Sequence, residues 1–402
     1  MSYINMLNNT LTTLPKVMII TTSRAEFGVM YWLINSLQAL PSIDCELLVT
    51  GNHLVPEQGY TIDEIKSEGV SVTESVEIMI SGYGAPAKAK SSALGMMSFS
   101  DVFARRSPDL VMVMGDRYEL LGIVSAAALM SIPVAHFSGG EITEGVVDDT
   151  VRHAITKMAQ LHFVSNDEHR GRVIQLGEQP ETVFNVGELG LENIRKYDTL
   201  TLSDLGESLN FHFRKPFILF TFHPVSIDQG LKGVEQLQVV LSALSKLTST
   251  YEILMTYPNN DEGGEEFVSL IKSFHESHQT NVFVIASLGF KRYLSALKHC
   301  AFVMGNSSSG LIEAPSLSKP TVNIGNRQTG RTRGTNVIDV DVDEAAILEA
   351  VNKAGSIDFQ KSLKSASNPY GDGFTVDRVI DVIGKISWPI NCRKKFYNIG
   401  TK

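Results

Sequence analysis

The chain of 402 residues has little cysteine, little tryptophan and no long hydrophobic run. Its three cysteines, Cys45, Cys300 and Cys392, form no CxxC pair and no cluster with histidine, which argues against a disulfide framework or a structural zinc site and is typical of a reducing compartment. No apolar stretch reaches the roughly 18 residues that a membrane-spanning helix needs. Residues 1–16 lack the basic-then-apolar pattern of a secretory signal. We therefore expect a cytoplasmic protein with no membrane partner.

Basic residues are also in the minority. Lys and Arg number 35 against 44 Asp and Glu, which gives a formal net charge of −9 at pH 7. Proteins that bind nucleic acids usually carry a basic stripe, so we expect no nucleic-acid partner. An anionic small ligand stays compatible with this charge, because a phosphate responds to local arginines and backbone N–H groups.

Several nucleotide-binding and catalytic signatures are missing. The chain has no G-x-x-x-x-G-K-[ST] loop and no G-x-S-x-G elbow. The run GYGAPA at Gly82–Ala87 fits G-x-G-x-x-A formally, but it contains a proline and does not follow the first strand. ATP hydrolysis and hydride transfer lose support, and we expect no redox cofactor.

What the chain does have is a regular alternation of short apolar runs and helix-like stretches. Such β-rich runs separated by helices predict parallel sheets covered on both faces. At 402 residues the chain exceeds the roughly 250–300 residues of one hydrophobic core. We therefore predict an α/β protein of two Rossmann-like, doubly wound domains that face each other across a cleft.

The expected domains are residues 1–195, residues 196–385 with the ligand-binding loops, and a tail at 386–402, whose packing on the first domain the sequence leaves open. The stretch Lys196–Asn210 is the expected linker, and Tyr118–Met130 and Asp149–Ala159 are expected helices. The predicted strands are Lys16–Thr21, Cys45–Val49, Leu110–Met114, Pro133–Phe137, His162–Val164, Val183–Val186, Phe217–Phe222, Glu252–Thr256, Val282–Ile285, Ala301–Met304 and Thr321–Ile324.

Polar residues follow several of these strands directly, which is where doubly wound sheets bind their ligands. Ser23 and Arg24 follow the first strand at a helix start, a position that attracts phosphate. Asp116 and Arg117 follow the strand that ends at Met114. Each pair also has a local interpretation, as a helix cap with a solvated arginine and as a capping ion pair.

The densest polar region is HFSGGEITEGVVDDTVRH, residues 136–153. Gly139 and Gly140 let the backbone approach a ligand closely. Crowded carboxylates push their pKa values apart, which gives one site both an acid and a base; one of the two aspartates can instead cap the next helix. No metal-ligand spacing is convincing, so we predict no metal, with a divalent ion as the weaker alternative. The polar members are His136, Glu141, Glu144, Asp148, Asp149, Arg152 and His153.

Comparable groups follow the strands of the second half. The run GNSSSG supplies hydroxyls and N–H groups at a helix start, which is typical of a phosphate cradle. A carboxylate one turn later could hold a ribose diol, and the Gly-rich loop NIGNRQTGRTRG carries three arginines, with a solvated turn as the plain alternative. The residues concerned are His223, Asn260, Asn306, Ser307, Ser308, Glu313, Arg327, Arg331 and Arg333.

Taken in order, the segments SRAEFG, GDRYELL, HFSGGEITEG, DDTVRHAITKMAQLHF, FHPV, PNND, GNSSSG and NRQTGR resemble the hydrolysing UDP-N-acetylglucosamine 2-epimerases, over roughly residues 16–335. The resemblance implies a glycosyltransferase-B-like fold, a UDP-sugar substrate and assembly as a homodimer or homotetramer. It also implies a place in nucleotide-sugar metabolism on the way to sialic acid or the related legionaminic acid.

The resemblance also assigns roles to residues. Sialic-acid-type members often carry Glu at the position of Ser138, so that either Glu141 takes over this role or the substrate differs; we count Glu141 among the catalytic residues. The other residues with implied catalytic roles are Asp116, Asp148, Asp149, Arg152 and His223. Those expected to hold UDP are Arg24, Arg117, Asn260, Asn306, Ser307, Ser308, Glu313 and Arg327.

The expected reaction follows from the chemistry of the sugar. The C2 hydrogen is not acidic, but departure of UDP from C1 builds oxocarbenium character that loosens it. One acid of the Asp116, Glu141 and Asp148 group then removes the C2 proton, while arginines and the Ser307–Ser308 turn stabilise the departing diphosphate. The resulting glycal gains a proton on the opposite face of C2 and water at C1, which gives N-acetylmannosamine and UDP.

Four alternatives stay open. The same reaction could act on UDP-2,4-diacetamido-2,4,6-trideoxyglucose, in legionaminic acid synthesis. A non-hydrolysing 2-epimerase would release UDP-sugar, and a retaining glycosyltransferase of the same fold would need an acceptor site. A UDP-sugar-binding regulator would show no turnover.

Overall fold

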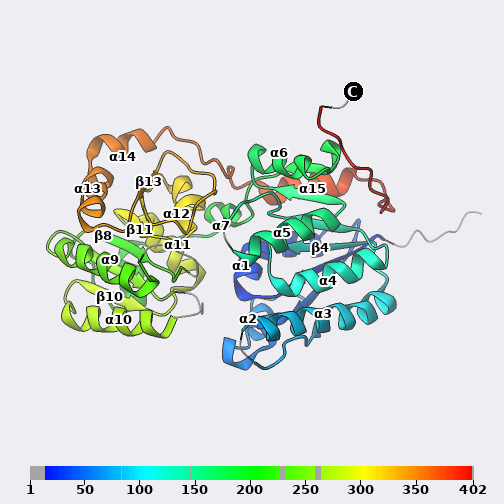
Figure 1. Ribbon diagram of the computed structural model, residues 1–402, viewed down its shortest axis with the longest axis horizontal. Helices are drawn as coiled ribbons and strands as arrows, with labels where there is room; N and C mark the ends of the chain where they lie inside the picture. The colour runs from blue at the N-terminus through cyan, green and yellow to red at the C-terminus, as the bar shows by residue number, and fades with distance from the viewer. Residues whose placement is uncertain (1–13, 83, 145, 226–230, 259–263, 401–402) are drawn as a thin grey trace, which may run out of the picture. The chain divides into compact units, whose positions relative to one another are not determined.

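A computed structural model describes residues 14–82, 84–144, 146–225, 231–258 and 264–400. By its internal contacts the chain divides into two compact units, each built on one parallel sheet (Figure 1). The first unit comprises Met1–Gly140, Thr150–Val186 and Val376–Lys402, and the second unit comprises Glu141–Asp149 and Gly187–Thr375.

The first unit contains a seven-stranded sheet in the order β3-β2-β1-β4-β5-β6-β7. Every strand pair in this sheet is parallel. The strands are β1 (Lys16–Thr21), β2 (Asp44–Thr50), β3 (Glu74–Val76), β4 (Leu110–Met114), β5 (Val134–Phe137), β6 (Leu161–Val164) and β7 (Val183–Asn185). The accompanying helices are α1 (Arg24–Gln38), α2 (Ile62–Ser67), α3 (Ala85–Arg106), α4 (Tyr118–Leu129), α5 (Val147–Met158), α6 (Asp167–Gln175) and α15 (Thr375–Lys385).

The second unit contains a six-stranded parallel sheet in the order β10-β9-β8-β11-β12-β13. Its strands are β8 (Phe217–Thr221), β9 (Glu252–Thr256), β10 (Val282–Ile285), β11 (Phe302–Gly305), β12 (Thr321–Ile324) and β13 (Val337–Val340). Its helices are α7 (Gly190–Lys196), α8 (Leu202–Leu209), α9 (Gly233–Leu247), α10 (Gly264–Ser277), α11 (Gly289–His299), α12 (Ser309–Ile312), α13 (Glu344–Gly355) and α14 (Ile357–Leu363).

Both sheets are buried on their two faces, as continuous apolar strands require. In β1, Met18 and Ile20 join the core formed with α3, α4 and α5, while Val17 and Ile19 are equally buried and belong to the opposite face. In the second unit α9, α10 and α13 cover one face, and α8 and α11 cover the other. The predicted fold class, an α/β chain with two doubly wound sheets, is confirmed.

Two edge strands and one helix escaped the sequence interpretation. β3 and β13 pair only on one side and are short, so they carry little apolar signal. The expected linker Lys196–Asn210 contains α8, whose Leu205 and Leu209 are buried in the core of the second unit.

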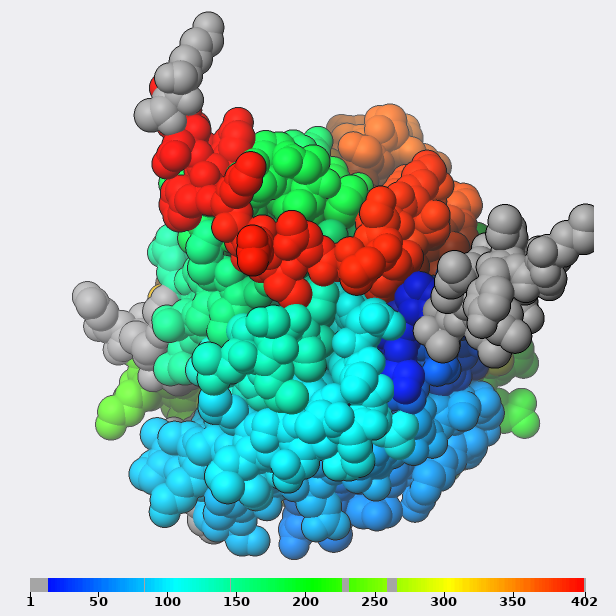
Figure 2. Space-filling view, turned by 90° about the vertical axis from the view of Figure 1, so that its right-hand side faces the viewer, coloured from blue at the N-terminus to red at the C-terminus, as the bar shows by residue number. Residues whose placement is uncertain are grey.

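The C-terminal segment Cys392–Tyr397 lies on the surface of the first unit (Figure 2). The backbone N–H of Tyr397 donates to the carbonyl oxygen of Gly177 at 2.8 Å. The side-chain amide of Gln179 donates to the backbone carbonyl oxygen of Lys395 at 3.0 Å. Within the described ranges, none of the helices has the length and apolar character needed to cross a bilayer.

Candidate active site

In doubly wound sheets, ligands bind where the strand order reverses, beyond the carboxyl ends of the strands. In the first sheet this point lies between β1 and β4. Ser23 and Arg24 follow β1, and Asp116 and Arg117 follow β4. Four of the predicted residues therefore share one edge of the first sheet.

Asp116 forms an ion pair with Arg152 of α5. The side chain of Arg152 is only 3% exposed, whereas that of Asp116 keeps 27% of its surface accessible. A buried guanidinium that holds a partly accessible carboxylate is a common way to orient an acid or base. The structure thus brings together two of the predicted catalytic residues.

Arg117 is paired with the buried carboxylate of Glu119. Glu26 of α1 lies close enough to influence the same guanidinium, and its carboxylate accepts a hydrogen bond from the backbone of Thr22 at 2.6 Å. Burial raises the pKa of Glu26 to about 7, and Arg117 opposes that shift. The sequence interpretation did not single out Glu26 or Glu119, although Glu26 stands within the SRAEFG segment.

Arg24 lies in an exposed ion pair with Glu64 of α2, at 2.9 Å between Nε and Oε2. Its side chain is 55% exposed. Ser23 caps α1 together with Glu26 in a reciprocal capping box. Ser23 therefore has the capping role that the sequence left as an alternative, whereas Arg24 is paired with Glu64 and is accessible to a ligand that displaces this carboxylate.

The acidic loop Glu141–Asp149 belongs by its contacts to the second unit. Glu141 is 3.9 Å from Arg331, and the Oδ1 atom of Asp149 accepts a hydrogen bond from the backbone of Thr143 at 2.7 Å. Asp149 thereby closes the loop at the start of α5, while Asp148 in the same helical turn is exposed.

Gly330 makes the close approach between this loop and the Gly-rich loop possible. A Cβ atom at Gly330 would lie 2.8 Å from Cγ2 of Ile142, and its φ of +86° is unfavourable for other residues. Arg331 beside it reaches Glu141 and also acts electrostatically on Glu313. The sequence did not distinguish Arg331 from the other two arginines of this loop. Its position between Glu141 and Glu313 depends on how the two loops pack, which the sequence pattern does not show.

In the second sheet the strand order reverses between β8 and β11. Asn306, after β11, clamps His223, after β8: its Oδ1 atom accepts from the His223 backbone N–H at 2.7 Å, and its Nδ2 atom donates to the His223 carbonyl at 2.9 Å. The carbonyl of Asn306 accepts from Arg327 at 3.1 Å and from Gln328 at 2.8 Å. Asn306, 1% exposed, thus holds three loops together.

His223 is neutral at physiological pH in this setting. Burial, with a smaller contribution from the positive charge of Arg327, lowers the pKa of His223 to about 3. A neutral imidazole can donate one hydrogen bond and accept another. His223 can therefore form hydrogen bonds with a ligand, but it does not supply a positive charge.

Ser307, Ser308 and Glu313 surround a short helical turn after β11. Ser307 and Ser308 are half-buried, and the hydroxyl of Tyr293 donates to Ser309. Burial raises the pKa of Glu313, which the Ser309 hydroxyl and Arg331 oppose. Oε2 of Glu313 is buried and has no hydrogen-bond partner among the described residues. A buried carboxylate oxygen without a partner is unusual in a folded protein.

Asn260 lies outside the described residues, so its predicted contact with UDP stays a prediction. In the part of the chain that the structure describes, no three or more His, Cys, Asp or Glu side chains are grouped to hold a metal ion.

A family model described as UDP-N-acetylglucosamine 2-epimerase matches residues 35–384. The chain belongs to this family. It is 35% identical to the polysialic acid biosynthesis protein P7 of Escherichia coli, over 96% of each chain. It is 34% identical to the GDP/UDP-N,N'-diacetylbacillosamine 2-epimerase (hydrolyzing) of Campylobacter jejuni, over 86% of this chain and 89% of the relative.

The solved structures agree with the sequence relatives. The crystal structure of the UDP-GlcNAc 2-epimerase from Neisseria meningitidis bound to UDP-GlcNAc matches with a TM-score of 0.78 at 19% identity, over 92% of this chain and all of that one. The family and the glycosyltransferase-B-like fold that the sequence motifs implied are both confirmed, and this epimerase-family chain is an enzyme that uses a UDP-sugar.

Proposed function

We propose that the chain is a hydrolysing 2-epimerase that converts UDP-N-acetylglucosamine to N-acetylmannosamine and UDP. The observation that carries the proposal is the Asp116–Arg152 pair, a carboxylate oriented by a buried arginine at the point where the first sheet reverses its strand order. Relatives at 34–35% identity whose names carry "hydrolyzing" or polysialic acid biosynthesis support the reaction type. A cytoplasmic homodimer or homotetramer remains part of the proposal.

We assign nucleotide binding to the second unit. Neutral His223, Arg327 and the hydroxyls of Ser307 and Ser308 would meet the diphosphate, and their N–H and O–H groups would stabilise the charge that develops as UDP leaves. Glu313, whose Oε2 atom lacks a donor, would accept a hydroxyl of the ribose. Asn306 would act behind them by holding His223 and Arg327 in register.

We assign proton transfer to the carboxylates. Departure of UDP from C1 loosens the C2 hydrogen. The carboxylate of Asp116, or one in the loop Glu141–Asp149, then removes this hydrogen as a proton, which gives the glycal and UDP. An acid on the other side returns a proton to C2 from the opposite face, while water adds its hydroxyl to C1 and gives up one proton. The sum is one water consumed, with a free 2-epimerised sugar and UDP as products.

A second substrate has a specific observation in its favour. Two relatives at 34% identity are named N,N'-diacetylbacillosamine 2-epimerases. The chain also carries Ser138 at the start of the acidic segment, with φ +61°. The 4-acetamido-6-deoxy sugar is therefore the alternative substrate.

The test incubates the chain with each of the two UDP-sugars and separates free sugar, UDP and UDP-sugar by ion exchange. We expect free N-acetylmannosamine and UDP in equal amounts from the first substrate, and Asp116→Asn should lower the rate by about 100-fold or more. Asp101→Asn, an exposed change on α3, serves as the control. Release of 2-epimerised UDP-sugar instead would show a non-hydrolysing enzyme.

A further inference from the structure

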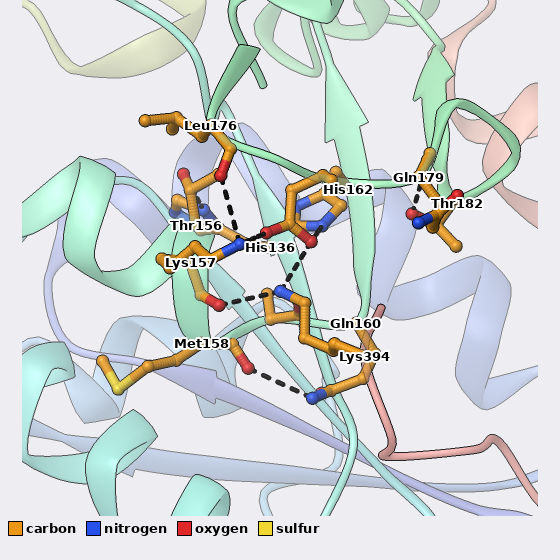
Figure 3. Close-up of polar contacts among 12 residues, drawn as sticks. His136, Thr156, Lys157, Met158, Gln160, His162, Leu176, Gln179, Thr182 and Lys394 are labelled. Atoms are coloured by element: carbon orange, nitrogen blue, oxygen red, sulfur yellow. Dashed lines mark hydrogen bonds and ion pairs between the residues drawn. The ribbon is translucent and has the colours of Figure 1, made fainter. Parts of the chain in front are cut away.

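His136 lies at the centre of a buried group in the first unit. It stands on β5 with its side chain fully buried (Figure 3). Its Nε2 atom is 2.8 Å from the carbonyl oxygen of Gly115, and its Nδ1 atom is 3.0 Å from Oγ1 of Thr156. Burying an imidazole is costly unless its nitrogens are satisfied, so this arrangement specifies one orientation of the ring.

The hydrogen-bond chemistry fixes which nitrogen carries the proton. A carbonyl oxygen can only accept, so Nε2 is the donor to Gly115. Burial lowers the pKa of His136 to about 3, and the ring is therefore neutral near pH 7. Nδ1 is then an acceptor that lies 3.0 Å from Oγ1 of Thr156. The Thr156 hydroxyl has a single proton, for which Nδ1 competes with the carbonyl oxygen of Arg152.

Both members of the Asp116–Arg152 pair are connected to this ring. Gly115 directly precedes Asp116 in the chain. On the other side, Oγ1 of Thr156 lies 2.9 Å from the carbonyl oxygen of Arg152, one turn earlier on α5. A displaced His136 ring would therefore remove the hydrogen bond to the carbonyl oxygen of Gly115 and leave this turn with the bond from the Gly115 N–H to the carbonyl oxygen of Phe137, at 3.2 Å.

The turn that leads to the acidic loop closes over the same group. A Cβ atom at Gly139 would lie 2.9 Å from Oγ1 of Thr156 and 3.3 Å from Nδ1 of His136. There is thus no room for another side chain between the ring and this turn. The packing therefore holds the His136 ring in one position.

We propose that His136 is a positioning residue for the reaction: it holds the Gly115–Asp116 turn against Arg152 and so sets where the Asp116 carboxylate stands. The inference rests on the proposed function, because it assumes that Asp116 reacts. His136 has no contact with the sugar in this role. Misplacing a reacting group by about 1 Å costs on the order of 100-fold in rate.

The test compares three buried substitutions. In His136→Gln the longer amide can still donate to the Gly115 carbonyl, whereas in His136→Asn the shorter amide cannot reach it. His162→Gln is the matched control, since His162 pairs with His136 across β5 and β6, is equally buried and contacts Glu178 at 3.1 Å instead. Circular dichroism and calorimetric titration with UDP show whether each variant is folded and binds nucleotide.

We expect His136→Asn to lose about 100-fold in kcat with KM and UDP affinity within a few fold of wild type. His136→Gln should recover most of that loss, and His162→Gln should lower stability with kcat unchanged. Full kcat in His136→Asn, or equal losses in all three folded variants, would overturn the inference while leaving the proposed function intact. A wild-type chain that released no UDP from either sugar would overturn the proposed function first.

Discussion

At the scale of single residues, neighbours and burial decide the charge of the candidate site. His223 and His136 are buried and held neutral, with pKa values lowered to about 3. Glu26 behaves in the opposite way, because burial raises its pKa to about 7. Each unit therefore contributes a buried, neutral imidazole among its candidate residues, and desolvation is the main cause of the pKa shift in each case.

The buried histidine of the second unit predicts an acid-sensitive stability. The pKa of His223 is about 3 in the folded chain against an ordinary 6.5, so the unfolded chain binds the proton more tightly. The stability that the folded chain gains from keeping His223 neutral is fully present above pH 6.5 and is lost as the pH falls toward 3. At pH 5 the loss is about 2 kcal/mol.

Urea unfolding at pH 8, 6.5 and 5 measures this effect in wild type and His223→Gln. The variant should lose less stability between pH 6.5 and 5 than the wild type does. His212→Gln, at an exposed position of the same unit, is the control and should follow the wild-type curve. Parallel curves for wild type and His223→Gln would contradict the assignment.

How far single residues could be predicted depends on how local their partners are. Asp116 comes shortly after the end of β4 and Arg152 lies in the dense polar segment of residues 136–153, so the sequence placed both among the candidates. The clamp between Asn306 and His223 joins positions 83 apart, which no local pattern shows. Arg24 was predicted to bind phosphate, and its pairing with Glu64 of α2 could not be foreseen because it depends on how α2 packs.

At the scale of elements, the strands after which chemistry was expected are all present in the sheets, either with the predicted bounds or with one or both ends shifted by one residue. Their apolar runs are continuous because both faces are buried, which gives a strong signal. β3 and β13 were missed because an edge strand needs less apolar surface. The composition of the loops predicted where they occur but not how they pack. The Gly-rich loop packs against the acidic loop because Gly330 leaves room for Ile142.

The loop contact at Gly330 gives the prediction at this scale. Gly330→Ala forces a side chain into a φ of +86° and toward Ile142, so the Gly-rich loop should move away from the acidic loop. We expect a loss of about 1 kcal/mol in stability and a fall of roughly tenfold or more in kcat/KM.

Gly384→Ala is the matched control for that change. Gly384 lies in α15, and a Cβ atom there meets nothing within 4 Å. Alanine in a helix is favoured by about 1 kcal/mol over glycine, so this variant should be at least as stable as wild type and equally active. Equal activity of Gly330→Ala and wild type would show that the loop contact does not matter for turnover.

At the scale of the whole molecule, the chain returns to the first unit at its C-terminal end. Lys394 forms an ion pair with the buried carboxylate of Glu178 at 2.6 Å, to which Lys157 and His162 also donate. Burial alone raises the pKa of Glu178, but these three donors outweigh it and lower the pKa to about 2. The tail is thus fastened to the first unit by a desolvated charge cluster.

Lys394→Met should therefore destabilise the first unit by about 1.5–3 kcal/mol at pH 7. Because the folded pKa of Glu178 is lowered, the contribution is present above about pH 4.5 and is lost as the pH falls toward 2. The difference between variant and wild type should shrink in the same range. Thermal unfolding at pH 7 and pH 4 measures this difference in stability. Lys395→Met is the control, because Lys395 contacts Gln179 through its backbone carbonyl oxygen. Equal melting of all three chains at pH 7 would contradict the account.

The central claim is that UDP leaves by elimination and that the C2 proton is removed and replaced. Proton NMR of the reaction with UDP-N-acetylglucosamine in deuterated water tests this claim most directly. We predict free N-acetylmannosamine that carries deuterium at C2, with UDP released in equal amount. Free sugar that retains its original hydrogen at C2 would contradict the mechanism, however fast UDP is released.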